Sequence, residues 1–360
     1  TKSICVKTGN SPMTEKTQTW LDTPANNASC AIIAEVAQNH DGSLGMAHAH
    51  IDAAATAGAD AIKFQTHIAE EESSSAEPWR TKFSYQDDTR MDYWRRMEFT
   101  PPQWQALKRH ADELGLHFLS SPFSIKAVEL LENLGISSWK IASGEITNTP
   151  LLDCVLATKK PIILSTGLSV TEEISEAVNY VQKAENPLAL LQCTSQYPCS
   201  PERLGINVIN QFRSDYNCAV GLSDHSGTIY SGLAAATQNI QVLEVHMTLS
   251  REMFGPDVVA SITTQELKSL IEGIRYIETA TNHPVDKSSP DSEAAPLRKI
   301  FMKSVYTTTA IKAGETITSD KITTKKPGTG IPANRINQLL GKKTKTNIEI
   351  NSMIQLEDLE

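Results

Sequence analysis

The sequence lacks several features that would indicate a membrane, secreted or nucleic-acid-binding protein. No apolar run reaches 18 residues, so no membrane-spanning helix is predicted. The 6 cysteines are few for 360 residues and form no CxxC pair, so we expect buried or inert thiols in a reducing, cytoplasmic setting. Basic charge is also scarce: 33 Lys and Arg against 42 Asp and Glu leave a net charge of -9, which argues against a non-specific nucleic-acid binder. An anionic substrate must therefore meet local positive charge.

Residues 1–30 lack the apolar core and the cleavage site of a signal peptide. This polar stretch is predicted to be an N-terminal extension that is flexible or docks a partner. The chain as a whole has 40% hydrophobic and 21% charged residues, which is typical of a globular protein. Its length suits one barrel of about 250 residues plus a smaller domain.

Short runs rich in Ile, Val, Leu and Phe alternate with helical patterns. This alternation is typical of βα units around a parallel sheet. The apolar runs cover residues 31–36, 61–65, 117–121, 138–142, 161–166, 188–193, 219–223 and 242–247. Such a set predicts a (β/α)8 TIM barrel over residues 31–283, while strand count alone leaves an open, doubly wound sheet as the alternative.

Capping boxes of the S/T-x-x-E/Q type predict the starts of three helices. They pair Thr100 with Gln103, Ser169 with Glu172, and Thr263 with Glu266.

A second domain is predicted after the last long helical pattern. Residues 284–296, PVDKSSPDSEAAP, have the Pro, Ser and charge content of a linker. Residues 297–360 then contain the β-like runs SVYTTT and TIT, the turn PGTG and the helical pattern NRINQLLG. This β-rich module is too small for a catalytic pocket of its own, so we expect it to contact substrate or another subunit.

Polar side chains end or follow nearly every predicted strand. In a βα barrel the carboxyl ends of the strands surround the active site. The residues are Glu35, Lys63, Gln65, Ser120, Ser121, Lys140, Ser143, Glu145, Ser165, Thr166, Thr194, Ser195, Tyr197, Ser223, Asp224, His225, Glu244 and His246. Core packing does not account for such a repeated placement, which therefore predicts a catalytic site.

Two kinds of chemistry are indicated within this set. Lys63 and Lys140, with hydroxyls from several strands, predict a cradle for phosphate and carboxylate, because ammonium groups neutralise the anion while Ser and Thr bond its oxygens. His225 and His246 end neighbouring strands, so their imidazoles can converge on one divalent cation, with water and substrate as further ligands.

Seven motifs in order resemble the sialic acid (nonulosonate) synthases. They are IIAEVAQNHDGSLGMAHAHIDAAATAGADAIKFQT, FLSSPFS, KIASGE, LSTGLS, QCTSQYP, GLSDH and FGPD. The resemblance covers residues 31–360, where SVYTTTAIKAGETITSDKITTKKPGTGI is similar to the antifreeze-like (SAF) domain of these synthases. It implies condensation of phosphoenolpyruvate with an N-acylated amino-sugar aldehyde, N-acetylmannosamine or a related hexose, to give a nonulosonate and phosphate.

The resemblance also implies roles for individual residues. Contacts to phosphoenolpyruvate fall on Lys63, Ser121, Lys140, Ser143, Ser195 and Ser223. Catalytic positions are Glu35, Glu145, His225 and His246, and the two histidines are the implied ligands of a divalent metal, usually Mn²⁺, with Mg²⁺ or Co²⁺ as alternatives. Contacts to the sugar fall on Gln65, Phe123, Tyr197, Asp257 and Lys326.

Two positions depart from the family's pattern. Ser195 replaces the usual Asn of a T-N-x-Y motif, which alters one phosphate contact. Lys326 stands where we expect an Arg that reaches the sugar's acyl group, and Lys lacks the planar guanidinium fork. The segment 66–99 is where substrates of the family differ, and its contacts stay unassigned at this stage. It includes Trp79, Arg80, Tyr85 and Gln86.

The implied mechanism has the metal polarise the aldehyde, C3 of phosphoenolpyruvate attack it, water add at C2, and phosphate leave by C–O cleavage. Glu35 is expected near the developing cation and Glu145 at sugar hydroxyls, although the sequence leaves these roles exchangeable. We expect a homodimer with exchanged C-terminal domains that place Lys326 over the sugar. Two alternatives stay open: a Schiff-base aldolase using Lys63 or Lys140, and a non-catalytic sugar-binding or ice-binding protein.

Overall fold

The computed structural model describes residues 29–289 and 293–360, and the chain divides into two compact units between His283 and Pro284. The predicted N-terminal extension, apart from its last two residues, lies outside this range. No helix in the described part of the chain is both long and apolar enough to cross a bilayer. No disulfide bond joins the five cysteines within it.

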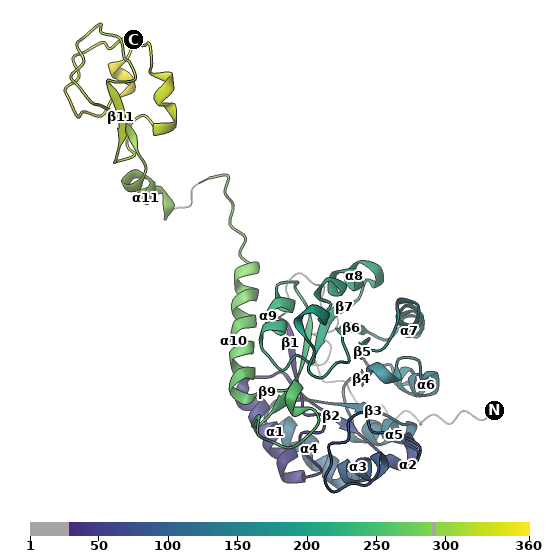
Figure 1. Cartoon of the computed structure of the whole chain (residues 1–360). Coiled ribbons are helices and arrows are strands. Elements are labelled where there is room, and N and C mark those ends of the chain that lie inside the picture. Colours follow the sequence, from purple (N-terminus) through teal and green to yellow (C-terminus); the bar gives the residue numbers. More distant parts are fainter. Residues whose placement is uncertain (1–28, 290–292) are drawn as a thin grey trace. The chain divides into compact units, whose positions relative to one another are not determined.

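The first unit is a ring of parallel strands surrounded by helices (Figure 1). The strands are β1 (Ala31–Glu35), β2 (Ala61–Thr66), β3 (His117–Pro122), β4 (Trp139–Ile141), β5 (Ile162–Ser165), β6 (Leu188–Cys193), β7 (Ala219–Asp224) and β8 (Val242–Thr248). Hydrogen bonds connect them in the order β3-β2-β1-β8-β7-β6-β5-β4, and the end strands β3 and β4 also lie in contact. The eight predicted strands and the TIM barrel are confirmed. The open doubly wound sheet is excluded because the first strand pairs with the last, β8, and the two end strands β3 and β4 lie in contact.

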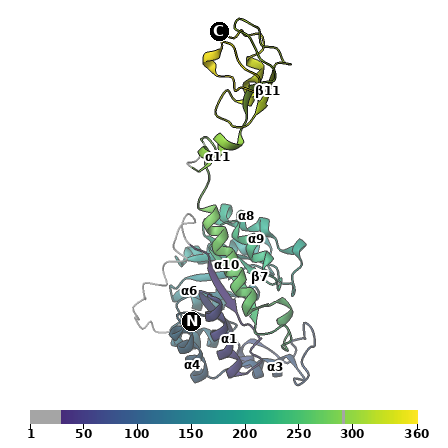
Figure 2. The ribbon, with the colours of Figure 1, turned by 90° about the vertical axis from the view of Figure 1, so that its left-hand side faces the viewer.

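Helices follow the strands around the outside of the barrel. They are α1 (Leu44–Ala57), α4 (Pro101–Glu113), α5 (Ile125–Leu134), α6 (Thr149–Ala157), α7 (Thr171–Lys183), α8 (Ile206–Tyr216), α9 (Tyr230–Ala236) and α10 (Thr264–Thr281). Two more helices, α2 (Ala69–Glu72) and α3 (Arg90–Met97), lie within the long segment between β2 and β3. A two-residue strand, β9 (Ile262–Thr263), pairs with the end of β8. The last barrel helix, α10, lies along the outside of the barrel in the turned view (Figure 2).

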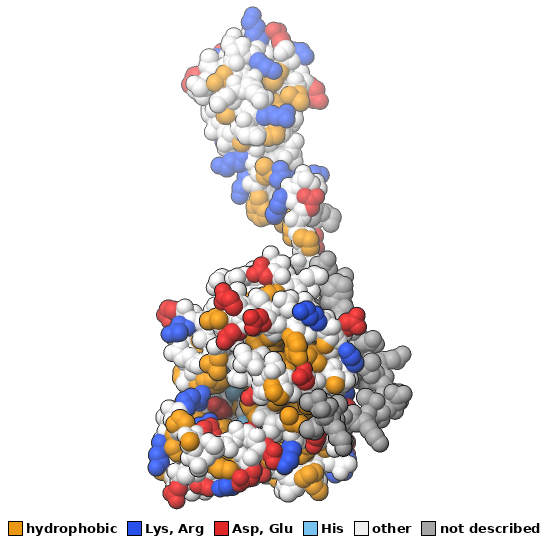
Figure 3. Space-filling view, turned by 90° about the vertical axis from the view of Figure 1, so that its right-hand side faces the viewer, with side chains coloured by type: hydrophobic (Ala, Val, Ile, Leu, Met, Phe, Trp, Pro, Cys, Tyr) orange, Lys and Arg blue, Asp and Glu red, His pale blue; other side chains and the backbone are white. Residues whose placement is uncertain are grey.

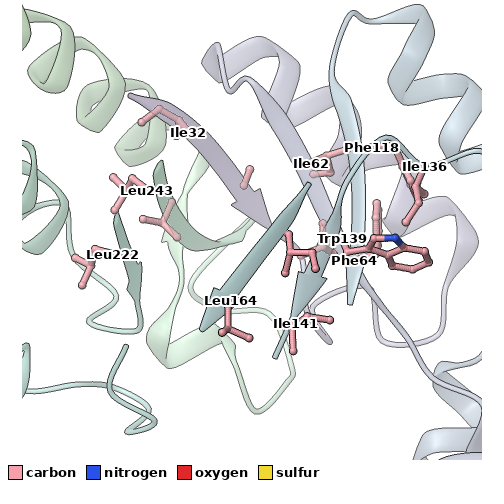
Figure 4. Packing of buried hydrophobic residues seen from close by; sticks show 14 of the residues in the cluster. Ile32, Ile62, Phe64, Phe118, Ile136, Trp139, Ile141, Leu164, Leu222 and Leu243 are labelled. Atoms are coloured by element: carbon pink, nitrogen blue, oxygen red, sulfur yellow. The ribbon is translucent and has the colours of Figure 1, made fainter. Parts of the chain in front are cut away.

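Alternation along each strand separates two apolar layers. Ile32 and Ile62 face the helices, where they join the large core that also contains Phe64 and Trp139 (Figure 4). Ile33, next to Ile32, belongs instead to a smaller cluster with Leu119, Ile163, Ala189, Leu191 and Val242. This inner cluster fills the barrel, so the polar residues further along the strands have a packed floor beneath them.

Two of the three predicted capping boxes are present. Gln103 accepts from the N–H of Thr100 at 2.8 Å, and Glu266 accepts from that of Thr263 at 2.8 Å. The third prediction was wrong: α7 begins at Thr171, and Glu173 accepts from the N–H of Val170 at 3.0 Å. The N-cap is Val170, one residue after Ser169, and because its side chain has no acceptor only the backbone half of a capping box forms.

The second unit has its own core, formed by Val305, Ile311, Ile317, Ile322, Ile331, Leu339, Ile348, Ile354 and Leu359. Its sheet consists of antiparallel strands β10 (Ser304–Thr307) and β11 (Ile322–Lys325). Three details correct the sequence analysis. Helix α11 (Ala294–Phe301) includes the end of the predicted linker, the run TIT contributes only the isolated bridge of Thr316 with Lys343, and NRINQLLG forms the short 3-10 helix Ala333–Gln338.

Candidate active site

Four charged side chains from β1, β2, β4 and β8 meet at the carboxyl ends of the strands. Lys63 Nζ lies 2.7 Å from Glu35 Oε2 and 3.7 Å from Glu244 Oε1, and Lys140 Nζ lies 3.2 Å from the same oxygen of Glu244. Parallel pairing sets Glu35 level with Lys63 on one side and His246 on the other, so their side chains share the inner face. All four side chains are almost fully buried. Burial of two positive and two negative charges is tolerated because each ion is paired with one of opposite sign.

Burial and pairing shift the pKa values of this quartet in different directions. Burial raises the pKa of Glu35 and lowers that of Lys140. Burial also opposes the charged forms of Glu244 and Lys63, but the opposite charges beside them outweigh it, lowering the pKa of Glu244 and raising that of Lys63. Of the two carboxyl groups in the quartet, that of Glu35 therefore takes up a proton more readily.

Hydroxyl groups surround the two lysines. Lys63 Nζ donates to Ser121 Oγ at 3.4 Å, and Ser223 Oγ donates to Glu244 Oε1 at 3.1 Å. The Gly167 N–H donates to Ser143 Oγ at 2.9 Å. A Cβ at Gly167 would lie only 2.5 Å from Ser195 Oγ, so the loop after β5 can approach these hydroxyls only with glycine. The arrangement offers several donors beside two ammonium groups, as an anion requires.

The two predicted metal-ligating histidines lie side by side, with ring centroids 5.0 Å apart. The Nδ1–H of His225 donates to the Thr194 carbonyl at 2.9 Å, which leaves Nε2 as the acceptor, 3.0 Å from Tyr197 Oη. His246 Nδ1 is buried and has no hydrogen-bond partner among the described residues. Burial lowers the pKa of His246 well below its ordinary value, so its ring is neutral and keeps a lone pair.

These features fit a divalent cation to which the protein contributes two nitrogen ligands. Within residues 29–289 and 293–360, no group of three or more His, Cys, Asp or Glu side chains is arranged to hold a metal. The remaining coordination positions would therefore have to come from water and substrate.

The predicted sugar-contacting residues of the barrel lie around this centre. Gln65 Nε2 donates to Glu35 Oε1 at 2.9 Å. Glu145 accepts from Asn148 Nδ2 at 2.6 Å, and partial burial raises its pKa. Asp257 accepts from the Gln38 N–H at 3.4 Å. Each of these polar groups is held by a neighbour, so their positions do not depend on substrate.

One cavity of about 560 Å³ connects these groups. The predicted residues that line it are Glu35, Lys63, Gln65, Ser121, Phe123, Lys140, Ser143, Glu145, Ser195, Tyr197, Ser223, His225 and His246. Asp257 lines an adjoining side chamber. On the face of the barrel unit shown in Figure 3, histidine and acidic side chains are visible in a hollow.

Four of the strand-end residues do not line the cavity, contrary to prediction. They are Ser120, Thr166, Thr194 and Asp224. Ser120 bonds Thr66 at 2.7 Å, and Asp224 accepts from Ser226 Oγ at 2.8 Å. Neighbouring strand residues alternate between faces, so Ser121 and Ser223 point inward while these residues bond elsewhere.

The sequence analysis gave no role to several residues that line the cavity. Glu244 completes the buried quartet, and Cys193, expected to be inert, has its Sγ 3.8 Å from His225 Nδ1. His67 stacks between Trp94 and Phe123, with ring centroids 4.0 and 4.6 Å away. The sequence analysis counted Glu244 among the strand-end residues but assigned it no specific contact, although it lies two residues before His246 and so on the same face of β8. The long connection that holds Trp94 offers no such periodic signal.

Lys326 belongs to the second unit. Its Nζ lies 5.2 Å from the centroid of the Phe301 ring of α11. Its placement over a bound sugar stays a prediction.

Comparison with known proteins matches both units. Residues 50–286 match the NeuB family, and residues 303–360 match the SAF domain. The chain is 36% identical over 330 residues to the N,N'-diacetyllegionaminic acid synthase of Campylobacter jejuni, covering 90% of this chain and 98% of that one. It is 32% identical to the N-acetylneuraminate-9-phosphate synthase of Homo sapiens, covering 91% of this chain and 92% of the human protein.

A solved structure agrees with these matches. The N-acetylneuraminic acid (sialic acid) synthetase of Leptospira borgpetersenii serovar Hardjo-bovis, crystallised with citrate, superposes with a TM-score of 0.67 at 30% identity, covering 76% of this chain and 90% of that chain. The family match, the order of the motifs and the barrel geometry agree with one another. The chain belongs to the NeuB family and has a C-terminal SAF domain.

Proposed function

We propose that this protein condenses phosphoenolpyruvate with an N-acylated amino-sugar aldehyde to give a nonulosonate and phosphate. Its relatives are synthases of legionaminic, pseudaminic and N-acetylneuraminate-type acids, and the chain covers more than nine-tenths of those relatives. The observation that carries the proposal is the buried quartet of Glu35, Lys63, Lys140 and Glu244 beside two histidines in one cavity. We further propose that the enzyme acts in the cytoplasm.

Phosphoenolpyruvate binding is assigned to the two lysines and the hydroxyl groups around them. The phosphate and carboxylate of the substrate form ion pairs with Lys63 and Lys140. Their oxygens accept hydrogen bonds from the hydroxyl groups of Ser121, Ser143, Ser195 and Ser223. Because both ammonium groups already contact carboxylates, the incoming anion competes with Glu35 and Glu244. Separation from Lys63 leaves Glu35, whose pKa burial has already raised, as the more basic of the two carboxylates.

The acceptor sugar is assigned to the opposite part of the cavity. Glu145, Gln65 and Tyr197 contact its hydroxyl and acyl groups, with Phe123 as an apolar wall and Asp257 at the side. His225 and His246 would hold a divalent ion, Mn²⁺ by analogy with the family, with Mg²⁺ or Co²⁺ as alternatives. When bound, such an ion supplies Lewis-acid polarisation of the aldehyde oxygen.

The reaction follows from this placement. C3 of phosphoenolpyruvate forms a bond to the aldehyde carbon, and positive charge develops at C2. The Glu35 carboxylate stabilises that charge and takes the proton from the water that adds at C2. The proton then passes from Glu35 to the oxygen of the former aldehyde. Collapse of the tetrahedral centre breaks the C2–O bond, so phosphate leaves with the bridging oxygen and takes up the proton of the C2 hydroxyl. The product is a 2-keto-3-deoxy acid, with nine carbons for a six-carbon acceptor.

We also propose a homodimer in which the SAF domain of one subunit covers the barrel of the other. The linker supports this proposal, because residues 284–289 join the two units without forming a helix or a strand. The function itself is tested by incubating the purified full chain with Mn²⁺, phosphoenolpyruvate and an acceptor. Phosphate and a nine-carbon keto acid should appear in equal amounts, and neither should form without acceptor.

A further inference from the structure

The hydroxyl of Tyr197 lies at the nitrogen of His225 that is available to a cation. The Nδ1–H of the His225 ring donates to the Thr194 carbonyl at 2.9 Å, so the free lone pair of the neutral ring belongs to Nε2. Tyr197 Oη donates to this Nε2 at 3.0 Å. A metal ion binds neutral imidazole through such a lone pair, so the ion and the hydroxyl compete for the same atom.

Packing holds the ring of Tyr197 in this position. The ring stacks on that of His225, with centroids 4.1 Å apart and planes inclined by 29°. The guanidinium carbon of Arg80 lies 4.6 Å from the centroid of the tyrosine ring, and the edge contact with His246 has a centroid distance of 5.7 Å. Tyr197 therefore borders both predicted metal ligands as well as the segment 66–99, to which Arg80 belongs.

The Tyr197 hydroxyl makes no second hydrogen bond in the part of the chain that the structure describes. When a cation takes the lone pair of His225 Nε2, the hydroxyl needs another acceptor. Tyr197 lines the main cavity together with Gln65 and Glu145, which are assigned to the acceptor sugar. An oxygen atom of a bound sugar can supply the missing acceptor, since a tyrosine hydroxyl donates one hydrogen bond.

We propose that Tyr197 couples the metal site to the acceptor site. Without a divalent ion its hydroxyl donates to His225 Nε2, and with the ion bound the hydroxyl is released and donates to an oxygen of the acceptor sugar. Metal and acceptor then each strengthen the binding of the other, because such coupling is reciprocal. The inference rests on the proposed function for the identity of the acceptor, whereas the competition at His225 does not depend on it.

The first test measures Mn²⁺ binding to the full chain by calorimetry. Tyr197→Phe keeps the ring and removes the competing hydroxyl, so Mn²⁺ should bind about twofold to tenfold more tightly than to wild type, the effect of one hydrogen bond. Tyr276→Phe makes the same chemical change in α10 at a residue that is 77% exposed and should leave the affinity unchanged. Unchanged or weaker Mn²⁺ binding by Tyr197→Phe would overturn the inference, since weaker binding means that the hydroxyl supports the ion.

The second test measures the acceptor side of the coupling by phosphate release at saturating Mn²⁺, with N-acetylmannosamine as the probe. Tyr197→Phe should raise the KM of this sugar about twofold to tenfold and leave that of phosphoenolpyruvate unchanged, because the lost hydrogen bond goes to the acceptor. Tighter metal binding together with a higher acceptor KM is the expected signature. A purely structural role of Tyr197 would weaken both, and an unchanged acceptor KM would refute the coupling.

Failure of the proposed function would be distinguishable. If wild type releases no phosphate, the proposed function fails, while the two Mn²⁺ affinities still decide whether the hydroxyl and the ion compete. Should Tyr197→Phe fail to fold, the ultraviolet difference spectrum of wild type with and without Mn²⁺ replaces it. Tyrosine absorption should shift to shorter wavelength as the hydroxyl stops donating to nitrogen, and His225→Ala should show no such shift. A wild-type spectrum that does not change would contradict the inference.

Discussion

Glu35 Oε2 lies 2.7 Å from Lys63 Nζ, and both side chains are almost fully buried. Replacing Glu35 with Gln keeps the size of the side chain and removes the charge. We expect turnover to fall by roughly 100-fold or more, the usual scale for a positioned acid or base, while phosphoenolpyruvate binds no more weakly than to wild type. Steady-state kinetics and calorimetric binding together check this. Unchanged turnover would remove Glu35 from the chemistry.

The same substitution should weaken the protein without ligand. Glu35→Gln leaves two buried lysines with a single carboxylate, and breaking a buried pair costs about 3–5 kcal/mol. Phosphoenolpyruvate supplies the missing negative charge, so it should raise the melting temperature of the variant more than that of wild type. An equal rise in both proteins would show that the anion does not bind at the lysines.

The histidine pair can be tested by metal content. His225→Ala and His246→Ala should each abolish turnover and reduce Mn²⁺ bound per chain, measured by calorimetry, while the circular dichroism spectrum stays that of wild type. His50→Asn offers a control, because His50 is buried in α1 with its Nδ1 on the Met46 carbonyl and does not line the cavity. A His225→Ala protein that stays active in chelator would contradict the metal assignment.

His67 is expected to be a positioning residue. Its Nδ1 lies 2.6 Å from Glu72 Oε1, and its Nε2 lies 3.2 Å from Gln65 Oε1, which links it through Gln65 to Glu35. His67→Phe keeps the stack with its aromatic neighbours and removes both polar contacts. We expect the acceptor KM to rise about tenfold with the KM of phosphoenolpyruvate unchanged, because Gln65 is assigned to the proposed sugar site. A purely structural role would instead lower the melting temperature without this split.

Asp87 anchors the segment 66–99 in a pH-dependent way. Burial tends to raise its pKa, but hydrogen bonds from Arg96 and Ser84 outweigh burial and lower it. The pKa of Asp87 in the folded protein is below its unfolded value of about 3.9. The stabilisation that the Asp87 carboxylate contributes is therefore complete above the unfolded pKa and is lost as the pH falls through the folded pKa. After correction for the intrinsic exchange rate, the protection of the amides in residues 84–97 should therefore decrease as the pH falls below about 4.

The control is a matched pair of variants. Asp87→Asn should show the faster exchange already at neutral pH, whereas Asp88→Asn, at an exposed neighbour, should behave as wild type. Exchange that is equally slow in Asp87→Asn would mean that the ion pair with Arg96 does not hold this segment.

Much of the barrel could be predicted because its signals are local. Buried parallel strands are continuous apolar runs, and residues such as Lys63 and His246 stand out among them by charge. The capping box predicted at Ser169 was wrong because α7 begins one residue later, and the backbone N–H of an N-cap donates to Glu173 whatever the side chain. His67 and Trp94 escaped prediction because they lie in the connection between β2 and β3, where spacing does not say which residues will meet.

Exchange of the SAF domains can be tested by mixing. Lys326→Ala should raise the KM of the sugar much more than that of phosphoenolpyruvate. Heterodimers of His225→Ala and Lys326→Ala subunits should then recover activity in the one site that combines an intact barrel with an intact partner lysine. Heterodimers that form normally but show only the parents' residual activity would place Lys326 in its own subunit's site.

The most direct test of the central claim uses phosphoenolpyruvate labelled with ¹⁸O at the bridging oxygen. With an acceptor sugar and Mn²⁺, the label should appear in the released phosphate, in equal amount to a nine-carbon 2-keto-3-deoxy acid. Borohydride with pyruvate should trap no adduct on Lys63 or Lys140. Condensation of pyruvate through a trapped lysine adduct, with no phosphate released from phosphoenolpyruvate, would contradict the account and identify a Schiff-base aldolase.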